Sequence, residues 1–203
     1  MNKEFYNDNG IDLAKKLLNK FLIREYENKK IVTKIVETEA YMGVIDKAAH
    51  AYKNRKSTRT YPLYLEGGHI YVYLIYGMYN CLNLSANKKN IPECVLIRAV
   101  EPISNLDEIS YNRFSKPYEE LNNYQRKNLT NGPGKLCKGL NIDRRLSGTD
   151  IFGKDIYIED NKCDDFKIVE DKRINIDYAE EDKDKLWRFY IKDNKYVSII
   201  KKE

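Results

Sequence analysis

The chain has 203 residues, and its 36 Lys and Arg against 31 Asp and Glu give a net charge of +5. A chain of this length can bury one substantial core, so we expect a single domain over residues 1–203. The positive excess is far below that of a histone-like protein, so it permits a nucleic-acid partner without requiring one.

Cysteine and histidine usage argues against a metal site. Cys81, Cys94, Cys137 and Cys163 stand singly without a C-x-x-C pair, and the chain has only two histidines. A zinc site needs closely spaced ligands of these types, so we expect no metal. Isolated cysteines, together with a polar start that lacks the apolar core of a secretory signal, are typical of reduced thiols in a cytoplasmic protein.

Residues 67–87 contain no Asp, Glu, Lys or Arg. A stretch of about 20 residues is nominally long enough to cross a bilayer. It is nevertheless rich in β-formers and interrupted by polar residues such as Asn80, Asn83 and Ser85. We therefore predict a pair of buried strands and no membrane partner.

In chain order, the first predicted element is a helix over residues 10–21, where apolar side chains recur at helical spacing and Asn9 or Asp12 can cap the start. The β-branched run 31–38 predicts a strand. Residues 42–68 form a long connection, which in a compact domain is usually functional or disordered.

A tight turn at Tyr76–Gly77 separates a predicted strand over 69–75 from a second strand that runs to Leu84. Such short connections favour antiparallel pairing. This mixture of elements indicates one α+β domain. The remaining predicted elements are strands over 94–100, 155–158, 166–169 and 187–191, a partly helical segment 105–129, an acidic solvated face within 159–184, and a helix entered at Pro133 and capped by Thr130 or Asn131.

The strand that runs into IVETEAY carries the first candidate chemistry. Because side chains alternate along a strand, Glu37, Glu39 and Tyr41 share one face. A carboxylate at the end of an apolar strand, flanked by Tyr41 and later by His50, can act as a base that activates water. The alternative is a pair of solvated glutamates on an edge strand, because unpaired carboxylates usually remain exposed.

Four tyrosines surround the predicted turn in GGHIYVYLIYGMYNCLN. Tyr71 and Tyr73 share a strand face, where paired rings most often pack in a core or across strands. Tyr76 lies at the turn itself, so its ring either projects as a wedge that enters a base stack or folds back onto the sheet.

A basic cluster occupies the long connection, with Lys53, Arg55, Lys56 and Arg59 within seven residues. Phosphate contact is one reading, because backbone charge dominates nucleic-acid affinity. The other interpretation is a solvated loop, since most runs of charged residues are simply exposed to solvent.

Two polar residues lie inside apolar strands. Arg98 in CVLIRAVEP needs a partner if it is buried, and Glu39 or Glu101 can provide one. It is either part of a site or one half of a structural ion pair. Asn83 in CLNLS must likewise find hydrogen bonds in the protein or contact a ligand.

At these residues the chain resembles the alkyladenine (3-methyladenine) DNA glycosylases of the vertebrate-type fold, and more specifically a bacterial member. The resemblance rests on IVETEAYMG, DKAAH, GGHIYVYLIYGMYNCLN, CVLIRAVEP and LTNGPGKLC in that order. It continues to LWRFYIKDNKYVSII and covers nearly the whole chain from about residue 10. It implies one compact α+β domain with a curved, mainly antiparallel sheet, surrounding helices and a protruding β-hairpin that enters the DNA minor groove.

The resemblance implies a role for each singled-out residue. Glu39 is expected to deprotonate a water that Arg98 and the backbone carbonyl near Ile174 help to hold. Such an enzyme rotates the damaged base out of the duplex and hydrolyses its N-glycosidic bond. The expected activity is that of a monofunctional glycosylase in base-excision repair, without a metal or organic cofactor.

The pocket and the DNA contacts follow from the same resemblance. Tyr41 and His50 are expected to stack on one face of the flipped base and Tyr73 on the other. Asn83 lines the pocket, where it can obstruct the exocyclic amino group of normal guanine. Tyr76 fills the gap that the base leaves, and the cluster of Lys53, Arg55, Lys56 and Arg59 contacts phosphates.

Damaged double-stranded DNA is therefore the expected partner of a monomeric cytoplasmic protein that associates with the nucleoid while it acts. The loop 57–64 departs from the family pattern, because Thr58-Arg59-Thr60 stands where Pro-Arg-Asn is usual. Two alternatives remain open. One is a non-catalytic binder of distorted DNA, and the other is a nucleosidase or RNA-base hydrolase that uses the same pocket.

Overall fold

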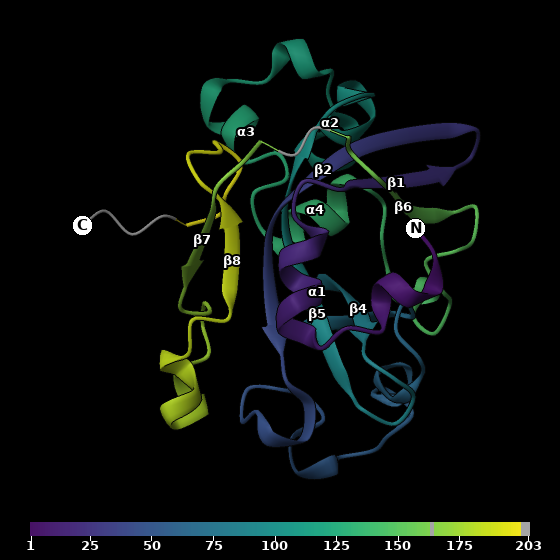
Figure 1. The fold of residues 1–203 in the computed structure, drawn as a ribbon. Helices are drawn as coiled ribbons and strands as arrows, with labels where there is room; N and C mark the ends of the chain where they lie inside the picture. Colours follow the sequence, from purple (N-terminus) through teal and green to yellow (C-terminus); the bar gives the residue numbers. More distant parts are fainter. Residues whose placement is uncertain (163–164, 200–203) are drawn as a thin grey trace.

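A computed structural model describes residues 1–162 and 165–199 of the protein, so Cys163 lies outside the described residues. The chain folds into an eight-stranded sheet whose pairings are all antiparallel, with helices packed around it (Figure 1). This confirms the predicted α+β class. The strands are β1 Phe21–Tyr26, β2 Lys29–Tyr41, β3 Ile70–Ile75, β4 Tyr79–Ala86, β5 Glu93–Pro102, β6 Ile156–Glu159, β7 Ile168–Asp171 and β8 Arg188–Ile191.

The α-helices are short and are supplemented by 3₁₀ turns. The helices are α1 Gly10–Leu17, α2 Leu106–Phe114, α3 Asn123–Lys127 and α4 Pro133–Gly139. The 3₁₀ turns are Lys3–Tyr6, Gly43–Ile45, Tyr52–Asn54, Tyr61–Tyr64, Tyr118–Glu120, Arg144–Leu146 and Asp177–Asp184.

The sheet is organised around β2. The strand order is β3-β4-β5-β2-β1-β6, and β8, which carries β7, also pairs with β2 (Figure 1). One edge of β2 follows β5, while the other edge pairs with β1 over its first half and with β8 at residues 37–39. Glu37 and Glu39 therefore lie on an interior strand, and the edge-strand alternative is wrong.

The register between β2 and β5 shifts on both sides of Glu37. Val36 on β2 and Arg98 on β5 consequently have no direct partner in this pairing. Bulges of this kind increase local twist and redirect side chains, and they are frequent beside functional sites. Here the bulge lies where Arg98 meets the two glutamates of β2.

Helix α1 covers the central strands β2, β4 and β5, and α4 packs on β4 and β5. Leu13, Ala14 and Leu17 form the buried stripe of α1, and Asn9 caps its start by accepting hydrogen bonds from two backbone amides. The helix stops at Leu17, earlier than predicted, because Asn19 adopts a left-handed conformation (φ 67°) that turns the chain into β1. Strand β1 was not predicted.

The helix after LTN begins at Pro133 as expected, but its cap is not the predicted one. Gly132 occupies the N-cap position without a side-chain bond. Thr130 instead donates to the carbonyl of Val100, and Asn131 accepts from Lys135. Both side chains are thus used to join this turn to its neighbours.

The uncharged segment 67–87 contains the whole β-hairpin of β3 and β4, as predicted. Ile75 pairs with Tyr79, so the connecting loop has three residues, one more than the predicted turn. Tyr76 and Gly77 both adopt left-handed conformations, with φ of 53° and 70°. Across the described residues, no helix combines the length and apolar character needed to span a membrane.

Candidate functional site

Glu39 lies on β2 with no exposed surface. Its Oε1 accepts a hydrogen bond from the backbone amide of Ile174 at 2.8 Å and lies 3.2 Å from Nη1 of Arg98. Its Oε2 accepts from the hydroxyl of Tyr41 at 2.8 Å. A buried carboxylate requires such donors, because an unpaired buried charge is very costly. The solvated alternative for this residue is therefore wrong.

Arg98 bridges the two buried glutamates of β2. Its Nε lies 3.4 Å from Oε1 of Glu37, and its Nη1 faces Glu39. Burial alone lowers the pKa of Arg98, but the charges of Glu39 and Glu37 raise it above its ordinary value. The other partner considered from the sequence, Glu101, pairs with Lys34 at 2.9 Å instead.

Glu37 anchors a second arginine behind the site. Nη1 of Arg188 donates to its Oε1 at 2.9 Å, and the backbone amide of Ser198 donates to its Oε2 at 2.7 Å. Arg188 also pairs with Asp171. Both oxygens of each glutamate thus contact protein groups. Glu39 differs in that one of its donors, Tyr41, lines a cavity.

Tyr41, His50, Tyr73 and Asn83 line one cavity of about 40 Å³, and Tyr71 also contributes to its wall. This space is enough for a few water molecules and far too small for a purine. The rings of His50 and Tyr73 pack edge to face with centroids 4.5 Å apart. The space between these two rings therefore does not accommodate a base in this structure.

The pocket keeps His50 neutral at physiological pH. Burial, with a further contribution from Arg59, lowers the pKa of His50 to about 4. Its Nδ1 lies 2.8 Å from the hydroxyl of Tyr71. Burial raises the pKa of Tyr71, so the phenol keeps its proton and can donate it to Nδ1.

Asn83 is buried on β4, with only 2% of its surface exposed. Its Nδ2 donates to the carbonyls of Tyr71 and Cys81, each at 3.2 Å. Both bonds tie the amide to its own hairpin and fix its orientation. Asn83 is among the residues that line the cavity.

The predicted basic cluster is exposed and divides in two. Arg55 and Arg59 line a second cavity of about 320 Å³ beside the first, and His50 is common to both. Lys53 and Lys56 do not line it. Their ammonium groups lie over the rings of Tyr52 and Tyr64, at 5.3 and 4.8 Å from the ring centroids.

Tyr178 is a pocket residue that sequence reasoning missed. It lines both cavities and remains 68% exposed. Burial raises the pKa of its phenol, and Tyr76 is close enough to add to this shift. Tyr178 stands in an acidic stretch without periodicity, so no sequence signal marked it.

Tyr76 at the hairpin tip is 75% exposed, so its ring does not fold back onto the sheet. At Ile174 it is the backbone amide, and not the expected carbonyl, that contacts Glu39. Among residues 1–162 and 165–199, no group of three or more His, Cys, Asp or Glu side chains is arranged to hold a metal ion.

This chain is similar to known proteins of one family. The family model described as methylpurine-DNA glycosylase matches residues 4–195. A relative from Clostridioides difficile is 66% identical over 201 residues, covering 94% of this chain and all of the relative. Relatives from Clostridium novyi and Clostridium perfringens are 59% and 52% identical, with 98% of each chain covered. All three bear the name "Putative 3-methyladenine DNA glycosylase". This chain belongs to the methylpurine-DNA glycosylase family and is a DNA glycosylase.

Proposed function

We propose that this protein removes alkylated purines, 3-methyladenine among them, from double-stranded DNA in base-excision repair. It rotates the damaged nucleotide out of the helix and hydrolyses the N-glycosidic bond with a water activated by Glu39. The proposal rests on one observation. Glu39 is fully buried, pairs with Arg98, and accepts a hydrogen bond from Tyr41 in the wall of the aromatic pocket.

The chemistry suits a single carboxylate. Departure of the base leaves positive character on the sugar, which a nearby carboxylate stabilises while it orients water toward C1′. Arg98 and the backbone at Ile174 contact the same Glu39 oxygen, so a water beside that oxygen also lies near them. Attack from the face opposite the leaving base inverts the configuration at C1′.

The aromatic residues suit a cationic leaving group. A base methylated at a ring nitrogen, such as 3-methyladenine, carries positive charge and departs with little acid assistance. The faces of Tyr41 and Tyr73 attract such a cation. A neutral His50 avoids repelling it, which a protonated ring would do.

Asn83 supplies the discrimination against normal guanine. Its amide is held by two backbone carbonyls and cannot easily turn away from the pocket. A purine with an exocyclic amino group directed at this side chain meets a fixed obstacle. Removal of guanine is thereby disfavoured by sterics and not by charge.

The exposed hairpin and the basic loop provide the DNA contacts. Tyr76 enters the space that the rotated nucleotide leaves, because an inserted ring offsets the cost of unstacking. Arg55, Arg59, Lys53 and Lys56 contact phosphates around it. The protein acts as a monomer in the cytoplasm, at the nucleoid.

Single-turnover assays on four substrates test the proposed activity. The native protein should release 7-methylguanine or 3-methyladenine from duplex DNA, and act far more slowly on the free nucleoside and on RNA carrying the same base. The reason is that only the duplex engages the hairpin and the basic loop. Equal rates on the nucleoside or RNA would identify a nucleosidase or RNA-base hydrolase. Binding to damaged duplex without release would identify a non-catalytic binder.

Replacing the hairpin tyrosine tests the wedge. Tyr76→Ala should weaken binding to a lesion-bearing duplex by about 1–3 kcal/mol, or roughly 5- to 150-fold in Kd, because one stacking partner is lost. Tyr124→Ala on α3 is the matched control, since both tyrosines are 75% exposed. Equal affinities of the two variants, measured by fluorescence anisotropy, would remove Tyr76 from the interface.

The depressed pKa of His50 should appear in the pH dependence of stability. The unfolded ring titrates near 6.5 and the folded ring near 4, so between these values the unfolded state binds more protons. The free energy of unfolding should therefore fall as the pH is lowered from 6.5 to about 4. Urea titrations should show that the free energy of unfolding falls less steeply with decreasing pH in His50→Gln than in the native protein. His69→Gln should not show this change. Identical slopes in native protein and His50→Gln would contradict a neutral, buried His50.

A further inference from the structure

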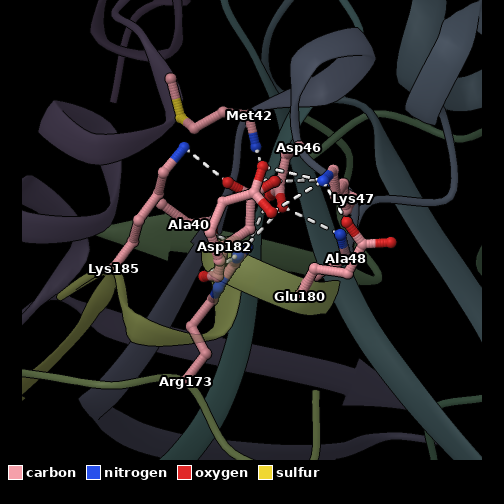
Figure 2. A network of polar contacts seen from close by, with 10 residues as sticks. Ala40, Met42, Asp46, Lys47, Ala48, Arg173, Glu180, Asp182 and Lys185 are labelled. Atoms are coloured by element: carbon pink, nitrogen blue, oxygen red, sulfur yellow. Dashed lines mark hydrogen bonds and ion pairs between the residues drawn. The ribbon is translucent and has the colours of Figure 1, made fainter. Parts of the chain in front are cut away.

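A second buried ion pair lies next to the candidate base, between Asp46 and Arg173 (Figure 2). The guanidinium binds the carboxylate with two bonds, Nη1 to Oδ2 at 2.5 Å and Nη2 to Oδ1 at 2.9 Å. Neither side chain has any exposed surface. Backbone amides of Met42 and Ala48 also donate to Asp46, each at 3.0 Å, so the carboxylate organises its own turn.

Arg173 contacts several segments at once. Its Nη1 donates to the carbonyl of Ala40 at 3.0 Å, and its Nη2 donates to the carbonyl of Asp182 at 3.2 Å. Its guanidinium lies between the rings of Tyr41 and Trp187, at 4.8 and 4.9 Å from their centroids. The guanidinium thus bonds three segments, which are the end of β2, the turn at Asp46 and the 3₁₀ turn Asp177–Asp184, and it also contacts Trp187 directly before β8.

Arg173 directly precedes Ile174, whose amide donates to Glu39 at 2.8 Å. Strand β7 ends at Asp171, so no strand pairing reaches Ile174. The side chain of Arg173 is therefore the nearest strong anchor for this amide. The same guanidinium supports the ring of Tyr41, whose hydroxyl donates to the other oxygen of Glu39.

We propose that Asp46 and Arg173 form a positioning pair that holds both donors, the Ile174 amide and the Tyr41 hydroxyl, against the Glu39 carboxylate. The inference rests on the proposed role of Glu39 as the base. Neither residue touches DNA; both act by fixing the orientation of the group that activates water. The stretch 46–50 also carries His50, so the pair joins the base to one wall of the pocket.

The chemistry of the pair fits this role better than general stabilisation does. Apolar residues of similar volume often stabilise a fold as well as a buried ion pair does. They cannot make four directed bonds from one guanidinium to three segments. The sequence interpretation of 159–184 as a solvated acidic face is accordingly wrong at Asp182, which is 3% exposed and accepts from Arg173 and from the amide of Lys47.

Asp46→Asn tests the pair with minimal change of shape. The variant should bind a duplex carrying 7-methylguanine with native affinity but release the base roughly 100-fold more slowly, because a small displacement of a reacting group has this effect. Its pH–rate profile is the decisive readout. Losing donors to a charged carboxylate favours the protonated form, so activity should be lost at a higher pH on acidification.

A second variant and a surface control complete the design. Arg173→Lys keeps the charge beside Asp46 but cannot reach all three segments, so it should reproduce the slower release and the shifted profile. Lys172→Ala breaks the neighbouring surface ion pair with Asp184, whose charged atoms lie 2.6 Å apart. This variant should leave the rate of base release and the pH–rate profile unchanged. Circular dichroism establishes the folded fraction of each variant.

Several outcomes would overturn the inference. One is a native rate of base release and a native pH–rate profile in folded Asp46→Asn and Arg173→Lys. Another is unfolding of both variants, which would make the pair purely structural. A third is a release rate reduced only in proportion to the folded fraction, with an unshifted pH–rate profile. Failure of the proposed function itself looks different, because the native protein would then release no base from this duplex.

Discussion

The site depends on the cost of burying charge. Glu37 and Glu39 lie two residues apart on an interior strand with no exposed surface, and Arg98 lies between them. Two buried carboxylates repel one another and lose hydration, and the buried Arg98 cation offsets both effects together with the hydrogen-bond donors to each glutamate. The double bulge between β2 and β5 accommodates this arginine inside the sheet. The positions of the other site residues depend on this buried cluster of Glu37, Glu39 and Arg98.

The two buried glutamates of β2 have different partners. Glu37 is saturated by Arg188 and Ser198, which fasten the segment after β8 to the sheet. Glu39 receives its donors from Ile174 and from Tyr41, and Tyr41 lines the aromatic pocket. In the proposed mechanism Glu37 has a structural role and Glu39 acts on the substrate.

The aromatic pocket adds a conformational requirement. Its cavity of about 40 Å³ cannot admit a purine while His50 packs on Tyr73. In the proposed mechanism, separating these rings would cost packing energy, which a base stacked on them would return. A base that stacks poorly, or that meets Asn83, would return less, so opening of the pocket would contribute to selectivity.

The sequence predicted the parts of the site that lie on regular strands. Alternation placed Glu39 and Tyr41 together, and an arginine in an apolar strand indicated a buried pair at Arg98. Periodicity could not reveal contacts made by irregular segments. Asp46, Arg173 and Tyr178 lie in turns, where no repeat links them to the pocket, and their partners are far away in sequence.

Errors in the predicted fold have similar causes. The helix over 10–21 was extended too far because apolar spacing continues past Leu17, while the left-handed turn at Asn19 leaves no periodic signal. Because the predicted helix ran to residue 21, where β1 begins, the start of this strand was assigned to the helix. The hairpin was predicted correctly because its strands are rich in β-formers and its turn contains glycine, although the loop is one residue longer.

The most direct measurement is single-turnover base release by Glu39→Gln from a duplex carrying 7-methylguanine, with binding measured on the same DNA. Glu101→Gln on β5 is the control, because its carboxylate pairs with Lys34 outside the pocket. A water-activating role predicts native affinity and a loss of about 100- to 10,000-fold in rate for Glu39→Gln alone. A near-native rate in that variant would contradict it.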